Sequence, residues 1–140
     1  MLACRTVSVS INASFDDVYE FSHKAENYEK WVAELEGLQC TAHHEWVTSV
    51  GGVTFTPYNS HGVLDYFIQV PGAMLHTAIR LLRNEEGCVA MTTIFRPEDT
   101  PEGIFAEGTA GAAKDLLKLK TLMEPDMSSV VRVDFQPKRK

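Results

Sequence analysis

TPEGIFAEGTAGAAKDLLKLKTLME, residues 100–124, has the pattern of a long amphipathic helix. Thr100 can cap its start with a hydroxyl, and Pro101 suits the first helical position because the N–H that proline lacks would have no partner there. Pro125 then prevents continuation. Apolar residues recur at steps of three and four, which predicts one buried face. These residues are Phe105, Ala112, Leu116, Leu119 and Met123.

The two halves of this face differ in bulk. Leu116 and Leu119 can fill a core, whereas the first half carries mainly glycine and alanine. Each glycine inside a helix costs about 1 kcal/mol relative to alanine, and there are three, Gly103, Gly108 and Gly111. We expect the helix to cover a cavity at its first half. The alternative is that small residues let the helix lie close to a sheet.

The composition is that of one globular domain: 140 residues, 44% hydrophobic and 23% charged. A net charge of −6 argues against a nucleic-acid surface, and no apolar run is long enough to span a bilayer. No signal-peptide pattern is present, so a cytoplasmic location is expected. The three cysteines are widely spaced, which favours reduced thiols over disulfides or a zinc site.

The order of predicted elements is strand, two short helices, several strands and the long helix. The helices are expected after Ser14, a good cap, and over 25–35. Turn residues between the later strands favour hairpins, and hence an antiparallel sheet. The strands are expected near residues 5–11, 38–41, 44–50, 52–58, 62–70, 73–83 and 88–96, with turns at Gly51–Gly52, Asn59–Gly62, Pro71–Gly72 and Asn84–Gly87. This order predicts an α+β fold in which the last helix crosses one face of a curved sheet.

We expect the domain to comprise residues 1–124, with 125–140 as a C-terminal tail. In the tail, Val131, Val133 and Phe135 alternate with Arg132 and Asp134. This alternation fits one more strand, and a mobile tail is the alternative.

Four segments resemble the START-like helix-grip superfamily (SRPBCC), which includes polyketide cyclases/dehydrases. They are VSVSINASFDDVYEFSHKAENYEKW at 7–31, GVLDY at 62–66, TTIFR at 92–96 and the helix at 101–124. The resemblance implies a curved antiparallel sheet of about six or seven strands wrapped around a long C-terminal helix, with two short helices after the first strand. It also implies a cavity between sheet and helix for apolar or amphipathic small molecules. It does not specify a function, because such scaffolds carry many chemistries.

The predicted strand 73–83 places His76 and Arg80 on one face. If that face borders the cavity, Arg80 could hold an oxyanion and His76 could move a proton. If it faces water, both are ordinary surface residues. Asp65 has apolar neighbours and needs a partner, so we expect a structural ion pair with Arg80 rather than a general base. We interpret Asp115, which lies among leucines, in the same way.

No metal or cofactor is expected. The five histidines have no ligand spacing, and no G-x-S-x-G motif is present. Aromatic residues are better evidence for a pocket, although some must form the core. The residues predicted to contact a ligand are Trp31, Trp46, Phe55, Tyr58, Phe67, His76, Arg80, Thr93, Phe95, Phe105, Gly108 and Ala112.

Three functions fit these features. The first is binding of an apolar or aromatic small molecule. The second is a polyketide cyclase or dehydratase that confines a flexible chain near His76, Arg80 and Thr93, with Asp65 as a further catalytic candidate. The third is an interaction protein with a filled core. The expected partner is a small hydrophobic or aromatic ligand, with a homodimer left open.

Overall fold

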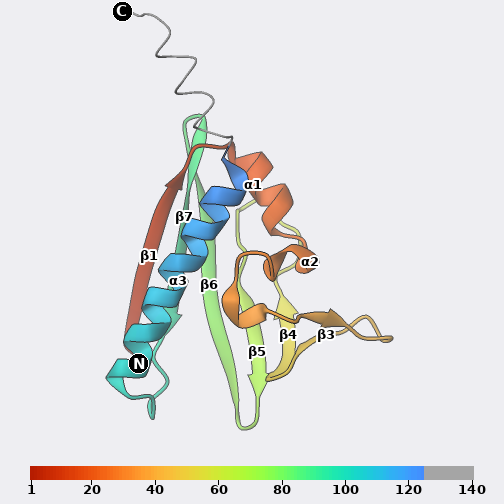
Figure 1. Ribbon diagram of the computed structural model, residues 1–140, viewed down its shortest axis with the longest axis vertical. Coiled ribbons are helices and arrows are strands. Elements are labelled where there is room, and N and C mark those ends of the chain that lie inside the picture. The colour runs from red at the N-terminus through yellow and green to blue at the C-terminus, as the bar shows by residue number, and fades with distance from the viewer. Residues whose placement is uncertain (125–140) are drawn as a thin grey trace, which may run out of the picture.

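The computed structural model describes residues 1–124 and shows a seven-stranded antiparallel sheet crossed by one long helix (Figure 1). The strand order is β1-β7-β6-β5-β4-β3-β2. The strands are β1 (Cys4–Ile11), β2 (Gln39–Cys40), β3 (Trp46–Thr48), β4 (Gly51–Phe55), β5 (Tyr66–Val70), β6 (Ala73–Asn84) and β7 (Gly87–Phe95). The helices are α1 (Phe15–Ser22), α2 (Ala25–Tyr28), a 3-10 turn η1 (Ala33–Leu35) and α3 (Glu102–Met123). The predicted α+β fold is confirmed. The predicted tail strand lies outside the described residues.

Helix α3 lies on the same side of the sheet as α1 and α2, over β1 and β7 (Figure 1). Its start differs from the prediction: the N-cap is Pro101, and no side chain caps the helix. Arg96 holds this end instead, because its Nε donates to the Thr100 carbonyl at 2.8 Å and its guanidinium pairs with Glu102 at 2.8 Å. The position of the helix start therefore depends on the end of β7.

The short helices follow the sequence in part. Ser14 caps α1 as predicted, with its Oγ accepting the Asp17 N–H at 3.0 Å. The second helix, expected over 25–35, ends at Tyr28. The chain then turns, and η1 completes the segment. This path buries four apolar side chains of the segment to at most 2% exposure: Tyr28, Trp31, Val32 and Leu35.

One predicted turn is wrong. Gly51 and Gly52 lie inside β4, and the turn precedes them at Ser49 and Val50. The physical reason is close strand packing, because a Cβ on Gly51 would lie 1.8 Å from the Gln69 carbonyl oxygen. Pro71–Gly72 does form a turn between β5 and β6, with Gly72 at φ +80°.

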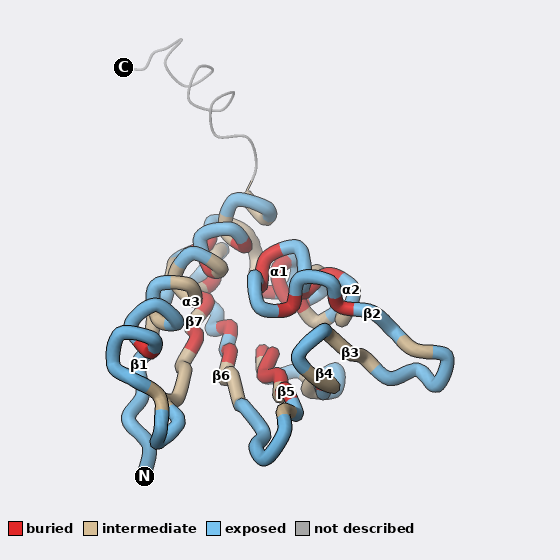
Figure 2. Tube along the Cα trace, turned by 60° about the horizontal axis from the view of Figure 1, so that its bottom comes forward, coloured by how far each residue is buried: buried red, intermediate tan, exposed pale blue. Residues whose placement is uncertain are grey.

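The core collects where α1, α2 and the C-terminal half of α3 meet the sheet (Figure 2). Leu116 and Leu119 of α3 are buried there, as the sequence predicts. The other end of α3 contributes only Phe105 to the buried set. Within residues 1–124, no helix has the length and apolar character needed to cross a membrane.

Candidate functional site

A pocket of about 740 Å³ lies beneath the N-terminal half of α3. Its walls come from α3, from β6 and β7, and from the segment around η1. They are mainly apolar and include Trp31, Tyr66, Ile79, Ile94, Phe95 and Phe105. The core therefore packs tightly under one half of the long helix and leaves space under the other.

The small residues of α3 form the cover of this pocket. Gly108, Gly111 and Ala112 all border it. A Cβ on Gly108 would lie 3.7 Å from Ile94 Cδ1, an ordinary contact, and a Cβ on Gly111 would meet nothing within 4 Å. Gly111 is therefore not required for close approach to the sheet, and its lack of a side chain adds room.

The pocket continues to the place where β6 and β7 separate. Their pairing stops at Thr77 and Ile94, while β6 continues to pair with β5 and β7 with β1. The rings of His76 and Phe95 stack at 5.4 Å just beyond this point. Both residues border the pocket at this point, although strand alternation assigns their side chains to the opposite face of the sheet.

Two carboxylates, Glu34 and Asp115, are among the polar groups of the pocket. Glu34 of η1 accepts hydrogen bonds from the Tyr66 hydroxyl and, at 3.4 Å, from the Thr77 hydroxyl. Burial, followed by the charge of Glu34, raises the pKa of Tyr66 well above its usual value. Tyr66 therefore stays a neutral hydrogen-bond donor near neutral pH.

Asp115 of α3 is the second carboxylate of this group. Its Oδ1 accepts the Ala33 N–H at 3.3 Å, which ties the helix to η1. Burial raises the pKa of Asp115 to about 6; the charge of Glu34 also raises it, while the Ala33 hydrogen bond and Lys118 lower it. Among the described residues, Asp115 forms no ion pair, so the structural ion pair expected from the sequence is wrong here.

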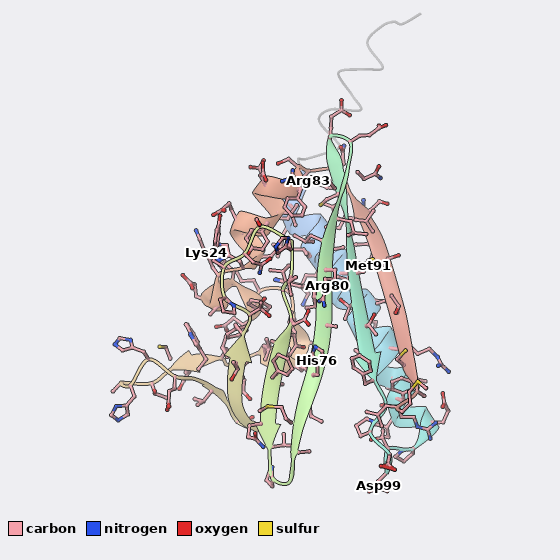
Figure 3. The ribbon with its side chains drawn as sticks, turned by 180° about the vertical axis from the view of Figure 1, so that it is seen from behind. Lys24, His76, Arg80, Arg83, Met91 and Asp99 are labelled. Carbon is pink, nitrogen blue, oxygen red and sulfur yellow. The ribbon has the colours of Figure 1, made fainter. Side chains whose placement is uncertain are left out.

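The outer face of the sheet, the face away from α3, carries His76 and Arg80 (Figure 3). Side chains alternate along a strand, so the inward positions of β6 are Thr77 and Ile79, which border the pocket. Both outward residues bind Asp65: Arg80 through an ion pair, and His76 through Nε2 at 2.9 Å. Asp65 also accepts the Ile79 N–H at 2.8 Å. The predicted Asp65–Arg80 pair is confirmed, and Arg80 does not converge on the pocket.

Half of the residues predicted to contact a ligand border the pocket. These are Trp31, His76, Phe95, Phe105, Gly108 and Ala112. Phe67, Arg80 and Thr93 do not, because strand alternation places them on the outer face. Phe67 stacks on His76 at 4.5 Å, and the Thr93 hydroxyl hydrogen-bonds Thr6 at 2.7 Å.

The other predicted contacts lie elsewhere in the fold. Trp46 and Phe55 border a separate hollow at β3 and β4, toward the far end of the sheet. Tyr58 is 66% exposed in the loop after β4, where its hydroxyl donates to Glu20 at 2.7 Å. The aromatic character of a residue was therefore not sufficient to predict that it borders this pocket.

Sequence reasoning missed the pair of carboxylates as pocket groups. Asp115 follows Gly108 and Gly111 at helical spacing, so the same periodicity that identified the roof could have assigned Asp115 to it. Glu34 gave no such signal, because the segment 29–36 does not follow the predicted helix. Within residues 1–124, no three His, Cys, Asp or Glu side chains gather in a way that could hold a metal ion.

No protein-family model matches the chain, and no curated protein matches its sequence. Solved structures do match its fold. CalU16 from Micromonospora echinospora superposes with a TM-score of 0.63 at 12% identity, over 93% of this chain and 82% of that one. DynU16, from the dynemicin biosynthetic locus, gives 0.63 at 17% identity, over 84% of this chain and 46% of that one.

The protein Ara h 8.0201 gives a TM-score of 0.59 at 8% identity, over 88% of this chain and 98% of that one. Identities this low show a shared fold and leave function open. The seven-stranded antiparallel sheet with its long C-terminal helix is the helix-grip fold.

Proposed function

We propose that this protein binds an apolar or aromatic small molecule in the pocket between α3 and the sheet. The observation that carries the proposal is the room left under the glycine-containing half of α3. Small-molecule sites typically enclose roughly 300–1,000 Å³ and combine apolar walls with a few polar groups. The pocket of about 740 Å³ has both features. Its presence argues against an interaction protein with a filled core.

The test is to fill the pocket with a larger side chain introduced on α3. We would titrate the purified protein with naphthylethanol, a neutral aromatic probe, and measure the dissociation constant by calorimetry. Gly111→Leu should weaken binding at least about tenfold, because the new side chain occupies the space of the ligand. Gly103→Leu is the matched control. Gly103 lies on the same helix, does not border the pocket, and has nothing within 4 Å of its would-be Cβ.

A second variant, Ala112→Phe, guards against a folding failure of the first. Equal affinity of the wild type and both pocket variants would contradict the proposal, and so would the absence of any binding to the wild type. Native mass spectrometry of protein freshly isolated from its own cells adds an independent readout. A retained small molecule should be present in the wild type and reduced in Gly111→Leu.

A second candidate function is catalysis on a confined chain, as in a polyketide-type cyclisation or dehydration. Asp115 favours it, because a carboxyl group with a pKa raised to about 6 suits acid–base chemistry near neutral pH. The residues named for this role from the sequence do not support it, since His76 and Arg80 are bound to Asp65. The test is loss of water from a β-hydroxyacyl thioester, followed by the absorbance of the unsaturated product. Asp115→Asn should abolish turnover if Asp115 is the acid–base group.

A further inference from the structure

The charges that border the pocket have one sign. Glu34, Glu98 and Asp115 are carboxylates, and the described residues of the lining include no lysine or arginine. Among the described residues of the lining, the only basic side chain is His76, and its Nε2 is hydrogen-bonded to Asp65. Electrostatic complementarity therefore favours a ligand that brings positive charge.

The hydrogen-bond donors to Glu34 and Asp115 are neutral, so they do not neutralise the charge of either carboxylate. Glu34 accepts from the neutral hydroxyls of Tyr66 and Thr77, and Asp115 accepts from a backbone N–H. Neither takes part in an ion pair among the described residues. Lys118 lowers the pKa of Asp115 but is not within ion-pair distance. These neutral donors orient the carboxylates without cancelling their charge.

The two charges also act on each other. The negative charge of Glu34 adds to burial in raising the pKa of Asp115. Asp115 is half-buried, whereas Glu34 is exposed at the edge of the pocket. Like charges held near each other are unfavourable, and a cation that contacts both relieves the repulsion. An ammonium group has three N–H donors for such contacts. The mainly apolar walls of the pocket are suited to the body of an organic ligand.

We propose that the pocket selects an apolar or aromatic molecule that carries a protonated amine, whose ammonium group contacts the carboxylates of Glu34 and Asp115. This inference rests on the proposed function, because it assigns a class to the ligand of the same pocket. It differs from the alternative considered from the sequence, in which Arg80 could hold an oxyanion if its face of the strand bordered the cavity.

Three probes with one aromatic body test the inference: naphthylethylamine, naphthylethanol and naphthylacetate, which are positive, neutral and negative near neutral pH. We expect the amine to bind the wild type about five- to tenfold more tightly than the alcohol, and the acetate to bind most weakly. Added salt should weaken binding of the amine and leave that of the alcohol nearly unchanged.

Variants then assign the selectivity to residues. Glu34→Gln and Asp115→Asn should each reduce the preference for the amine over the alcohol, and the double variant should bind these two probes about equally. Glu107→Gln is the matched control, because Glu107 is an exposed carboxylate of α3 that does not border the pocket. Thermal melts of each variant establish that it is folded.

The outcomes separate the two proposals. Equal binding of the three probes, or tightest binding of the acetate, would overturn the amine inference and leave the binding function standing. Binding of none of the probes to the wild type would overturn both. A preference for the amine that survives in the double variant would overturn the assignment to Glu34 and Asp115.

Discussion

Asp65 on the outer face of the sheet and Glu34 and Asp115 on the pocket face are carboxylates in different settings. Asp65 is 6% exposed, and its carboxylate contacts the Arg80 guanidinium, the His76 imidazole and the Ile79 N–H. Glu34 and Asp115 have only neutral donors within hydrogen-bond distance among the described residues. A fully partnered carboxylate such as Asp65 is part of the scaffold, whereas a carboxylate without a counter-charge beside an open pocket is a candidate for ligand recognition.

The largest expected effect concerns the outer face. Asp65→Ala should lower the free energy of unfolding by about 3 kcal/mol, because it removes the partners of Arg80, His76 and the Ile79 N–H at once. Urea unfolding measures the loss. Asp16→Ala is the control, since its pair with Arg83 is exposed and should contribute less than about 1 kcal/mol. An equal loss of unfolding free energy in Asp65→Ala and Asp16→Ala would contradict the assignment of Asp65 to the scaffold.

The pocket face should respond less to the loss of one hydrogen bond. Tyr66→Phe removes the hydroxyl that donates to Glu34 and should lower the free energy of unfolding by about 1 kcal/mol. Tyr58→Phe is a matched control, because Tyr58 also donates to a glutamate but is largely exposed. Its urea midpoint should hardly change. A loss for Tyr66→Phe as large as that for Asp65→Ala would show that both networks belong to the scaffold.

The space beneath α3 predicts a stabilising substitution. Gly111→Ala should raise the free energy of unfolding by about 0.5–1 kcal/mol, because alanine is the better helix former and its methyl group meets no atom. Gly103→Ala, also in open space, should give a similar gain. Thermal or urea unfolding compares the two. Loss of stability in Gly111→Ala alone would mean that the roof of the pocket has no spare room.

The smallest effect is a pH dependence. The folded pKa of Asp115 is raised from 3.8 to about 6, so the folded state binds its proton more tightly than the unfolded state does. This contribution to stability is complete below pH 3.8 and is lost as the pH rises through about 6. Asp115→Asn removes it, so the variant should gain stability relative to the wild type as the pH increases from 4 to 7. Solvent screening keeps the change below about 1 kcal/mol. Melting temperatures across this range should reveal it, and parallel curves would contradict the shift.

Local patterns in the sequence were sufficient to predict most of the elements. The alternation before Ile11, the Ser14 cap, the turn at Pro71–Gly72 and the apolar spacing along 102–123 all depend on residues close in the chain. Such patterns can be recognised without knowledge of the tertiary structure. The two leucines of α3 and the glycines before them likewise predicted which half of the helix would be packed.

The face on which each polar group lies was settled only by tertiary structure. The sequence paired His76 with Arg80, but the curvature and register of the sheet decided that Thr77 and Ile79 would face α3. The pocket carboxylates come from η1 and α3, which meet at the hydrogen bond between Ala33 and Asp115. Periodicity reports which residues share a face of one element, whereas the identity of the opposing surface depends on contacts between segments distant in sequence, here 82 residues apart.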